Sequence, residues 1–341
     1  MKSLLSVCLV GMLCLAPRVE ALGPRDRVSI VGSATLFPLA SIVGETFGRQ
    51  GRWKSPTIES TGTGLGFRLF CRGIGPDTPD ITDASRPMGK EEREACTRNK
   101  VGEVVELRVG YDGILIANGR SAPRFDLSRE QLYRALARQV PVGGRLVNNP
   151  YRRWREIDGR LPDLPILVYG PAPNHGTRDV FVGLAVRSVC EKQPEVQALG
   201  VEARRVACEA LREDGAWIDV TGDYSILLAR LVAEPRAVGV LGYGFLDRYR
   251  DRVQAARIDG VVPTLDAIVA GRYPLSRPLF LYVKAAHRGR VPGLSEFLSE
   301  FLSEQAAGPD GYLVDAGLVP QPQGLLEAER RKAVAPGLLR R

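Results

Sequence analysis

The sequence predicts an α/β protein with a parallel sheet, on three observations. Short runs with the alternation or apolar character of strands occur at Arg27–Gly32, Thr57–Ser60 and Asp80–Ala84. Each run leads into a loop of small and polar residues. The first two loops are followed by apolar residues at helical spacing, such as Leu39 and Val43, and the third by a polar helix at Lys90–Thr97. Successive strand, loop and helix units favour a parallel sheet, in which ligand groups collect at the carboxyl ends of the strands.

The chain is long enough for two domains with separate cores. It has 341 residues, of which 44% are hydrophobic and 25% are charged. The β-rich stretch Glu103–Asn118 forms either two strands or one strand that crosses between domains. Further strands are expected at Pro165–Tyr169 and Leu279–Val283.

The first residues, Met1–Ala21, have the pattern of a secretory signal peptide. Lys2 precedes an apolar run from Leu4 to Leu15, and small residues near its end suit cleavage before Leu22. The run is too short for a transmembrane helix. A lipoprotein is disfavoured because a leucine precedes Cys14. No other long apolar run follows, so we expect an exported protein without a membrane span.

The net charge of +8 does not by itself indicate a nucleic-acid partner. Basic residues are dense only in the tail, at Arg330-Arg331-Lys332 and Arg340-Arg341, and aromatic residues are not interleaved with them. We interpret them as a solvated surface that mildly attracts small anions. A structural zinc site is not expected, because the chain has two histidines and no Cys-x-x-Cys spacing.

Four cysteines follow the signal peptide, and an even number in an exported chain indicates two disulfides. Three pairings are possible. We favour Cys71–Cys96 with Cys190–Cys208, because each bond joins neighbouring segments and closes a short loop.

The stretch Ile58–Phe70 is the clearest candidate for ligand binding. A short strand passes through Thr61-Gly62-Thr63-Gly64-Leu65-Gly66 into a helix. Such a loop offers free backbone N–H groups, hydroxyls and the positive end of a helix, all of which suit an anion. The alternative is a packing turn, which is common in α/β proteins. The device recurs later, where Asn174-His175-Gly176-Thr177-Arg178 opens another helix.

Several of these segments together resemble the periplasmic phosphate-binding proteins, the PstS-like receptors of phosphate ABC importers. The segments that carry the resemblance are Gly32–Pro38, Ser60–Gly64, Asp80–Pro87, Gly176–Phe181 and Tyr273–Val283. The resemblance implies a two-lobed type II fold with two hinge crossings and a ligand cleft between the lobes. The lobes are expected at residues 22–113 with 265–325, and at residues 114–264. Residues 326–341 are expected to form a disordered tail.

The resemblance also carries candidate ligands for phosphate over to this chain. They are Thr35 and Leu36 in the first loop, Thr63 in the second, Ser85 and Arg86 in the third, and His175, Gly176, Thr177 and Arg178 in the fourth. Each has a structural alternative. Thr63 could be a helix N-cap and Ser85 a turn hydroxyl. Arg86 and Arg178 could form ion pairs with Asp83 or Asp179. The second histidine, His287, is expected to be exposed in a polar loop.

Three departures from the family pattern bear on specificity. Some members have an aspartate in the third loop that accepts the proton of hydrogen phosphate, where this chain has Ser85. Asp83 or Asp179 could take its place. An arginine that precedes the fourth loop in some members is absent, and Arg178 could replace it. His175 stands where a hydroxyl is usual, and its imidazole could make binding depend on pH.

The resemblance therefore implies a monomeric receptor that captures phosphate without a cofactor and delivers it to the permease subunits of an importer. One alternative is a receptor for another oxyanion or with a sensing role. A phosphoester hydrolase is a weaker alternative, because the chain lacks a G-x-S-x-G elbow and a recognisable carboxylate pair.

Overall fold

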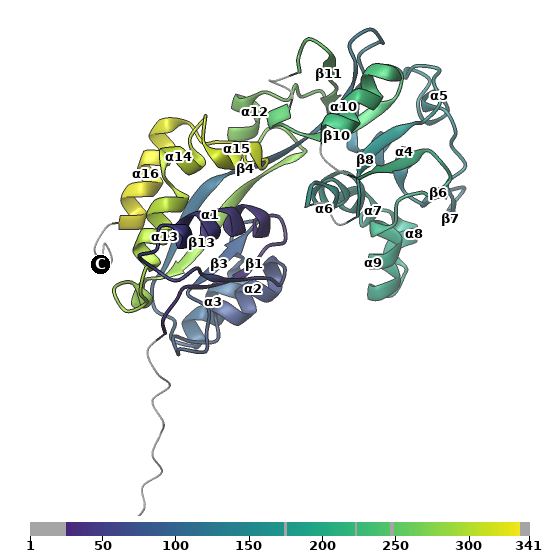
Figure 1. Ribbon diagram of the computed structural model, residues 1–341. Coiled ribbons are helices and arrows are strands. Elements are labelled where there is room, and N and C mark those ends of the chain that lie inside the picture. The colour runs from purple at the N-terminus through teal and green to yellow at the C-terminus, as the bar shows by residue number, and fades with distance from the viewer. Residues whose placement is uncertain (1–24, 174–175, 222–223, 246–248, 335–341) are drawn as a thin grey trace, which may run out of the picture.

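Three short parallel strands form the start of the first of two bodies (Figure 1). They are β1 (Ser29–Gly32), β2 (Thr57–Ser60) and β3 (Ile81–Ala84), and β1 lies between the other two. All three agree with the strands predicted from the sequence. The structure is a computed structural model and describes residues 25–173, 176–221, 224–245 and 249–334.

A helix follows each of these strands, as the sequence predicts. These are α1 (Phe37–Arg49), α2 (Thr63–Phe70) and α3 (Lys90–Arg98). In α1 the buried residues Leu39, Val43 and Phe47 recur every fourth position, so one face of the helix packs on the sheet. The proline at the start of α1 is well placed because its missing N–H has no partner there anyway.

One long strand, β4 (Val104–Gly119), joins the two bodies. It has sixteen residues and settles the alternative left open by the sequence, since it is a single strand. It pairs antiparallel with β13 (Ser276–Lys284), and the register shifts at a bulge between Leu279 and Phe280. The resulting sheet has nine strands, most of them in the order β2-β1-β3-β13-β4-β10-β8-β9, while β11 pairs with β4.

The second body contains β8 (Val168–Pro171), β9 (Trp217–Val220) and β10 (Val238–Gly242), which extend the sheet from β4. The other elements described for it are β5 (Asp126–Leu127), α4 (Arg129–Leu136), β6 (Gln139–Val142), β7 (Arg145–Asn148), α5 (Trp154–Ile157), α6 (Gly176–Phe181), the π-helical turn Val182–Arg187, α7 (Ser188–Cys190), α8 (Pro194–Gln197), α9 (Val201–Glu209), α10 (Tyr224–Ala233), β11 (Val253–Ala255), β12 (Arg257–Ile258) and α12 (Leu265–Val269).

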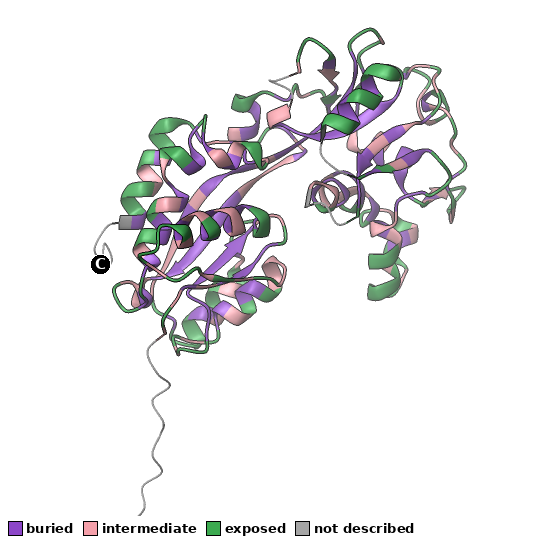
Figure 2. Ribbon diagram, viewed as in Figure 1, coloured by how far each residue is buried: buried purple, intermediate pink, exposed green. Residues whose placement is uncertain are grey.

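Each body has its own buried interior (Figure 2). In the first body, the apolar residues that pack together come from residues 28–109 and 279–333. In the second, they come from residues 111–275, joined by Val319. Ala267, Ile268 and Leu275 belong to the second core, so the expected return to the first lobe at residue 265 is wrong. The chain returns within β13.

The C-terminal part of the chain packs on the first body. Helices α13 (Leu294–Phe301), α14 (Glu304–Ala307) and α15 (Tyr312–Asp315) precede α16 (Gln323–Val334). The disordered tail expected from residue 326 is wrong for residues 326–334. Leu326 and Ala333, seven residues apart, are buried on one side of α16, which lies against α13 and β4.

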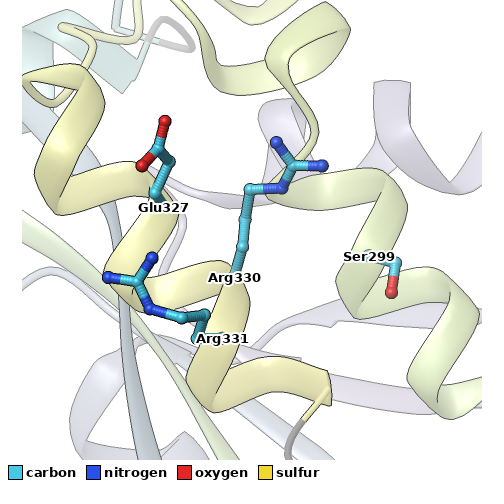
Figure 3. A pocket seen from close by; sticks show the side chains of 4 residues that line it. All are labelled: Ser299, Glu327, Arg330 and Arg331. Carbon is cyan, nitrogen blue, oxygen red and sulfur yellow. The ribbon is translucent and has the colours of Figure 1, made fainter.

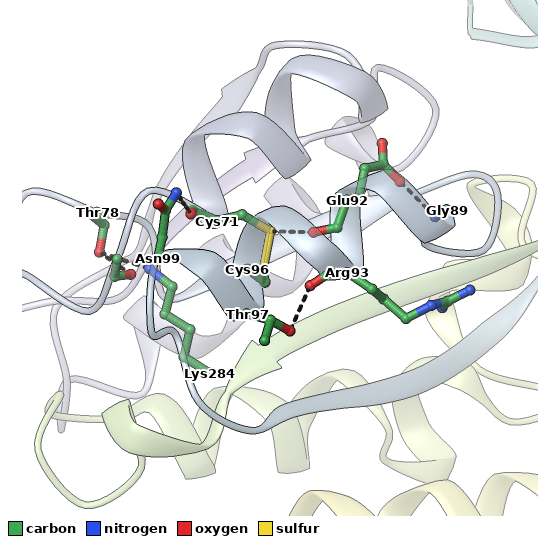
Figure 4. The surroundings of a disulfide bond; sticks show 10 residues. Cys71, Thr78, Gly89, Glu92, Arg93, Cys96, Thr97, Asn99 and Lys284 are labelled. Carbon is green, nitrogen blue, oxygen red and sulfur yellow. Dashed lines mark hydrogen bonds between the residues drawn. A yellow bond between two sulfur atoms is a disulfide. The ribbon is translucent and has the colours of Figure 1, made fainter.

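Both favoured disulfides are present, Cys71–Cys96 and Cys190–Cys208. The first ties α3 to the end of α2 (Figure 4). The second ties α9 to the helical segment that begins at α6. Within the described ranges, no helix combines the length and apolar character needed to cross a membrane.

A buried polar cluster lies at the opposite end of β13 from the second body. Lys284 is fully buried and donates to Thr78 Oγ1 at 2.7 Å (Figure 4), with its Nζ 5.0 Å from the centre of the Phe70 ring. His287 is also buried, with Nδ1 2.6 Å from Asp80 Oδ1, so the expectation that it is exposed is wrong. The sequence hid these contacts because their partners lie about two hundred residues apart.

Lys284 should make the stability of the protein rise with pH. Burial lowers its pKa from 10.5 to about 7, with Asp80 acting in the opposite direction. Between these values the unfolded chain holds more protons than the folded one, so alkaline solution favours folding. Relative to a Lys284→Met variant, the free energy of unfolding of the wild type should rise by about 2 kcal/mol from pH 7 to pH 9.

Chemical denaturation across this pH range measures the difference. Lys90→Met is the matched control, because Lys90 is an exposed lysine in α3 and its removal should leave the slope unchanged. Parallel curves for the wild type and Lys284→Met would show that Lys284 is not the titrating group.

Candidate anion-binding site

Three loops leave the first body at one level of the sheet. Gly32, the last residue of β1, pairs in register with Ser60 at the end of β2 and with Asp83 near the end of β3. Because the strands are parallel, their carboxyl ends share one edge. The loops that carry Thr35, Thr63 and Ser85 therefore start side by side.

The first loop is a tight turn built on Ser33. Its backbone N–H donates to the Asp83 carbonyl at 3.1 Å and to the Asp83 carboxylate at 2.5 Å. Its hydroxyl accepts from the N–H of Thr35 at 3.2 Å, and its carbonyl accepts from the N–H of Leu36 at 3.2 Å. An anion that accepts from the Leu36 N–H must compete with the Ser33 carbonyl, which already accepts from it at 3.2 Å. Gly32 has a φ of 144° and lies against Asp83, where a Cβ would meet the backbone oxygen at 2.1 Å.

The second and third loops are joined by their hydroxyl groups. Thr63 Oγ1 accepts from the N–H of Ser85 at 3.3 Å and lies 3.3 Å from the Ser85 hydroxyl. Thr63 is the first residue of α2, and Gly62 is the N-cap, so the alternative role of Thr63 as N-cap is wrong. The first N–H groups of α2 have no intrahelical acceptors. Thr63 and Ser85 thus stand together beside a helix start.

Arg86, in the third loop, is already paired. Its two terminal nitrogens donate to the two carboxylate oxygens of Glu92 at 2.8 and 2.7 Å. Glu92 also accepts from the N–H of Gly89 and so caps α3. The alternative of an ion pair is correct in kind, but the partner is Glu92 and not Asp83. The structure therefore uses Arg86 to hold the start of α3.

The fourth loop belongs to the second body and opens α6. Gly176 and Thr177 begin this helix, which continues through a π-helical turn into α7, while His175 lies outside the described residues. In Figure 1, α6 lies on the side of the second body that faces α1 and α2. The candidate residues therefore fall into two groups, one on each body.

Arg178, also in α6, binds its own body. It donates to Asp219 at 2.5 Å and to the Pro171 carbonyl at 3.1 Å, and its guanidinium lies 4.5 Å from the centre of the Trp217 ring. These contacts fasten α6 to β8 and β9. The partner of the ion pair is Asp219, where the sequence suggested Asp179.

Two carboxylates near the loops have raised pKa values. Burial raises the pKa of Asp83 well above its ordinary value, although the N–H of Ser33 opposes the shift. Asp83 is only 1% exposed and supports the first loop from beneath, which is unlike a group that faces a ligand. The protein around the Asp179 carboxyl group shields it partly from water, which raises its pKa against the opposing charges of Arg178 and Arg277, although the residue as a whole is exposed. Asp179 belongs to the exposed residues of α6.

Arg277 is a candidate that sequence reasoning missed. It lies at the start of β13, and its Nη2 donates to Thr35 Oγ1 at 2.6 Å. Its Nε lies 3.7 Å from Asp112 Oδ2, across the β4–β13 pair. The charge of Asp179 acts on it from the second body. An arginine just before the apolar run Leu279–Val283 was the available signal, but the residues that contact it could not be known from the sequence.

The pocket between α13 and α16 offers no comparable site. It has a volume of about 430 Å³ and is lined by Ser299, Glu327, Arg330 and Arg331. Figure 3 shows the two guanidinium groups pointing in different directions and the Ser299 hydroxyl away from both. Among the described residues, no group of three or more histidine, cysteine, aspartate or glutamate side chains could hold a metal ion.

Comparison with known proteins places this arrangement in a family. A model of the PBP superfamily domain matches residues 19–305. The chain belongs to the PBP superfamily. Among similar sequences, Protein SphX of Synechococcus elongatus is 28% identical over 83% of this chain and 76% of its own length. Phosphate-binding protein PstS of Staphylococcus haemolyticus is 24% identical over 86% of this chain and 80% of its own length.

Two solved structures have the same fold as this chain. A possible phosphate binding protein from Planctomyces limnophilus superposes with a TM-score of 0.72 at 24% identity, over 91% of this chain and 98% of its own. An ABC-type phosphate transport receptor from Vibrio cholerae gives 0.56 at 19% identity, over 87% and 100%. These likenesses confirm the predicted two-lobed type II fold, and the two bodies described above are its lobes.

The close packing of α2 on β1 gives a stability prediction for the first lobe. A Cβ on Gly66 would lie 2.7 Å from both Gly32 Cα and Thr82 Oγ1, whereas one on Gly64 would meet its nearest atoms at 4.0 Å. Gly66→Ala should therefore lower the free energy of unfolding by about 1–3 kcal/mol. Gly64→Ala, in the same helix, should leave it unchanged or raise it by up to about 1 kcal/mol.

Urea denaturation of both variants beside the wild type checks this. Equal effects of the two substitutions would mean that α2 does not rest on β1 as closely as described.

Proposed function

We propose that the protein is an extracytoplasmic solute-binding protein that captures inorganic phosphate between its lobes and delivers it to an ABC importer. The proposal rests on the alignment of the three first-lobe loops at one edge of the sheet. The pairing of Gly32 with Ser60 and Asp83 sets this alignment. That register gathers helix starts and hydroxyls at one edge. A tetrahedral dianion needs many donors, and helix N-termini supply them without a metal.

The second group of ligands comes from α6. Gly176 and Thr177 stand at the start of this helix, and closing of the lobes about β4 and β13 would bring them to an anion held by the first lobe. Phe37 and Leu65 are exposed apolar side chains in the first turns of α1 and α2. Their exposure supports closure, because the second lobe would cover them.

The relatives support phosphate as the anion. Proteins whose names specify phosphate binding or phosphate transport are similar to this chain over most of its length. Asp179 is the better-placed substitute for the missing third-loop carboxylate, because it belongs to α6 and is exposed, whereas Asp83 is enclosed beneath the first loop. An acceptor of this kind disfavours an anion that carries no proton, such as sulfate.

The proposed setting is the periplasm, with Met1–Ala21 as a removed signal peptide and the permease subunits of the importer as partners. The protein acts in this account as a monomer without catalysis. A sensing role in the same fold is the second candidate, since the site would serve either purpose. Binding measurements on the isolated protein test the site itself, which both roles share.

A thermal-shift titration of the ligand-free mature protein against phosphate, arsenate and sulfate tests the proposal. Phosphate and arsenate should raise the melting temperature in a concentration-dependent way, and sulfate should do so only at much higher concentration. Thr63→Val should weaken phosphate binding by about tenfold, because it removes a hydroxyl donor to a charged ligand.

Thr57→Val is the control for that substitution. Thr57 begins β2 at the end remote from the loops, and its hydroxyl donates to the Val28 carbonyl at 3.4 Å. Its loss should leave phosphate affinity unchanged. A wild type that none of the three anions stabilises would refute the proposed function.

A further inference from the structure

We propose that Arg277 supplies the guanidinium group that binds the anion, in place of the arginines that the sequence suggested. This inference rests on the proposed function and names a specificity-determining residue of its site. Three observations support it. Strand β13 places the Arg277 side chain at the loops, its Nε has no hydrogen-bond partner among the described residues, and Arg86 and Arg178 already form ion pairs.

The register of β13 carries Arg277 to the edge where the loops begin. Phe280 of β13 pairs with Ala84, the last residue of β3. Arg277 stands three residues earlier on an antiparallel strand, so its backbone extends about 10 Å beyond the end of β3 on the side of the loops. Side chains two apart on a strand share a face. Arg277 therefore lies on the face of Leu279, which packs in one core with Leu36 of the first loop.

The bond to Thr35 leaves that hydroxyl ready for an anion. Arg277 Nη2 donates to Thr35 Oγ1 at 2.6 Å, so the oxygen is used as an acceptor and its own proton remains a donor. A guanidinium and a hydroxyl aimed from adjacent positions suit two oxygens of one tetrahedral anion.

Arg277 is incompletely paired. Its Nε and the Oδ2 of Asp112 are buried, and neither atom has a hydrogen-bond partner among the described residues. The two atoms lie 3.7 Å apart, which is too long for a hydrogen bond. A buried donor without an acceptor destabilises the protein, and an anion that accepts from Arg277 Nε would remove that cost.

The other two candidate arginines already have carboxylate partners. Arg86 forms a two-pronged pair with Glu92, and Arg178 is held by Asp219, Pro171 and Trp217. Binding an anion through either would break contacts that hold α3 or α6. Binding an anion through Arg277 would break no contact that holds a helix in place.

Charges from both lobes converge on Arg277. Asp112 faces it from β4, and the charges of Asp179 and Arg187 reach it from the helical segment that begins with Gly176 and Thr177. Burial lowers the pKa of Arg277, which means that its positive charge is poorly solvated. An anion placed between this strand and α6 would compensate that charge and attract both lobes.

Calorimetric titration of the ligand-free protein with inorganic phosphate tests the assignment. Arg277→Lys keeps the charge but loses the planar fork, and should weaken binding about 10- to 100-fold. Arg178→Lys should weaken it less, through the positioning of α6. Arg212→Lys is the control for loss of stability alone, because Arg212 is a buried, paired arginine remote from the loops. The phosphate affinity of this variant should equal that of the wild type.

A second measurement needs no substitution. Modification of the wild type with phenylglyoxal, read by mass spectrometry of peptides, should show Arg277 protected by phosphate. Unchanged affinity in Arg277→Lys, or a larger loss in Arg178→Lys, would overturn the assignment while leaving phosphate binding intact. If Arg277→Lys does not fold, a wild type whose Arg277 reacts equally with and without phosphate overturns it. Absence of phosphate binding by the wild type would overturn the proposed function together with this inference.

Discussion

The antiparallel pairing of β4 with β13 is the constraint on which the rest of the structure depends. Each strand begins in one lobe and ends in the other, so the same hydrogen-bonded ladder belongs to both cores. The change of core falls at Gly110, between Val109 and Tyr111. The bulge at Leu279 and Phe280 lies opposite the same point. A bulge and a glycine allow a strand pair to bend without losing its pairing, which is what lobe closure requires.

The same pairing sets the electrostatics of the site. Asp112 and Arg277 are cross-strand partners at the place where the lobes meet. Arg277 reaches Thr35 in one lobe and interacts with Asp179 of the other. An anion bound beside Arg277 would interact electrostatically with the β4–β13 pair and with residues of both lobes. In the proposed function, binding and closure would be coupled through a residue of the sheet itself, and the loops would contribute donors around it.

The sequence predicted the features that are set by local patterns. Strand ends at Gly32, Ser60 and Ala84, the loops after them and both disulfides follow from spacing and residue type. It could not predict contacts between distant segments. Arg178 looks like an anion ligand in a first helical turn until Trp217 and Asp219 are placed beside it. Helix α16 carries the charged run Glu329–Lys332, which concealed the two buried residues that dock the helix.

Arg86 is held on two sides by a carboxylate, whereas Arg277 has an unpaired Nε. Among the described residues Arg108 and Arg204 also have buried Nε atoms without a partner, so the bond to Thr35 at the loops is what sets Arg277 apart. A guanidinium that a carboxylate already holds on two sides, as in Arg86, gains little from an anion, since one charged bond replaces another. The protein tolerates unpaired buried atoms at Asp112 and Arg277, within the part of the chain that the structure describes. In the proposed site, a phosphate oxygen that accepts from Arg277 Nε would remove the cost of that one unpaired donor, about 1–3 kcal/mol. In the proposed function, a phosphate that accepts from Arg277 Nε favours the conformation in which it is bound, because a ligand shifts an equilibrium toward the state that binds it better.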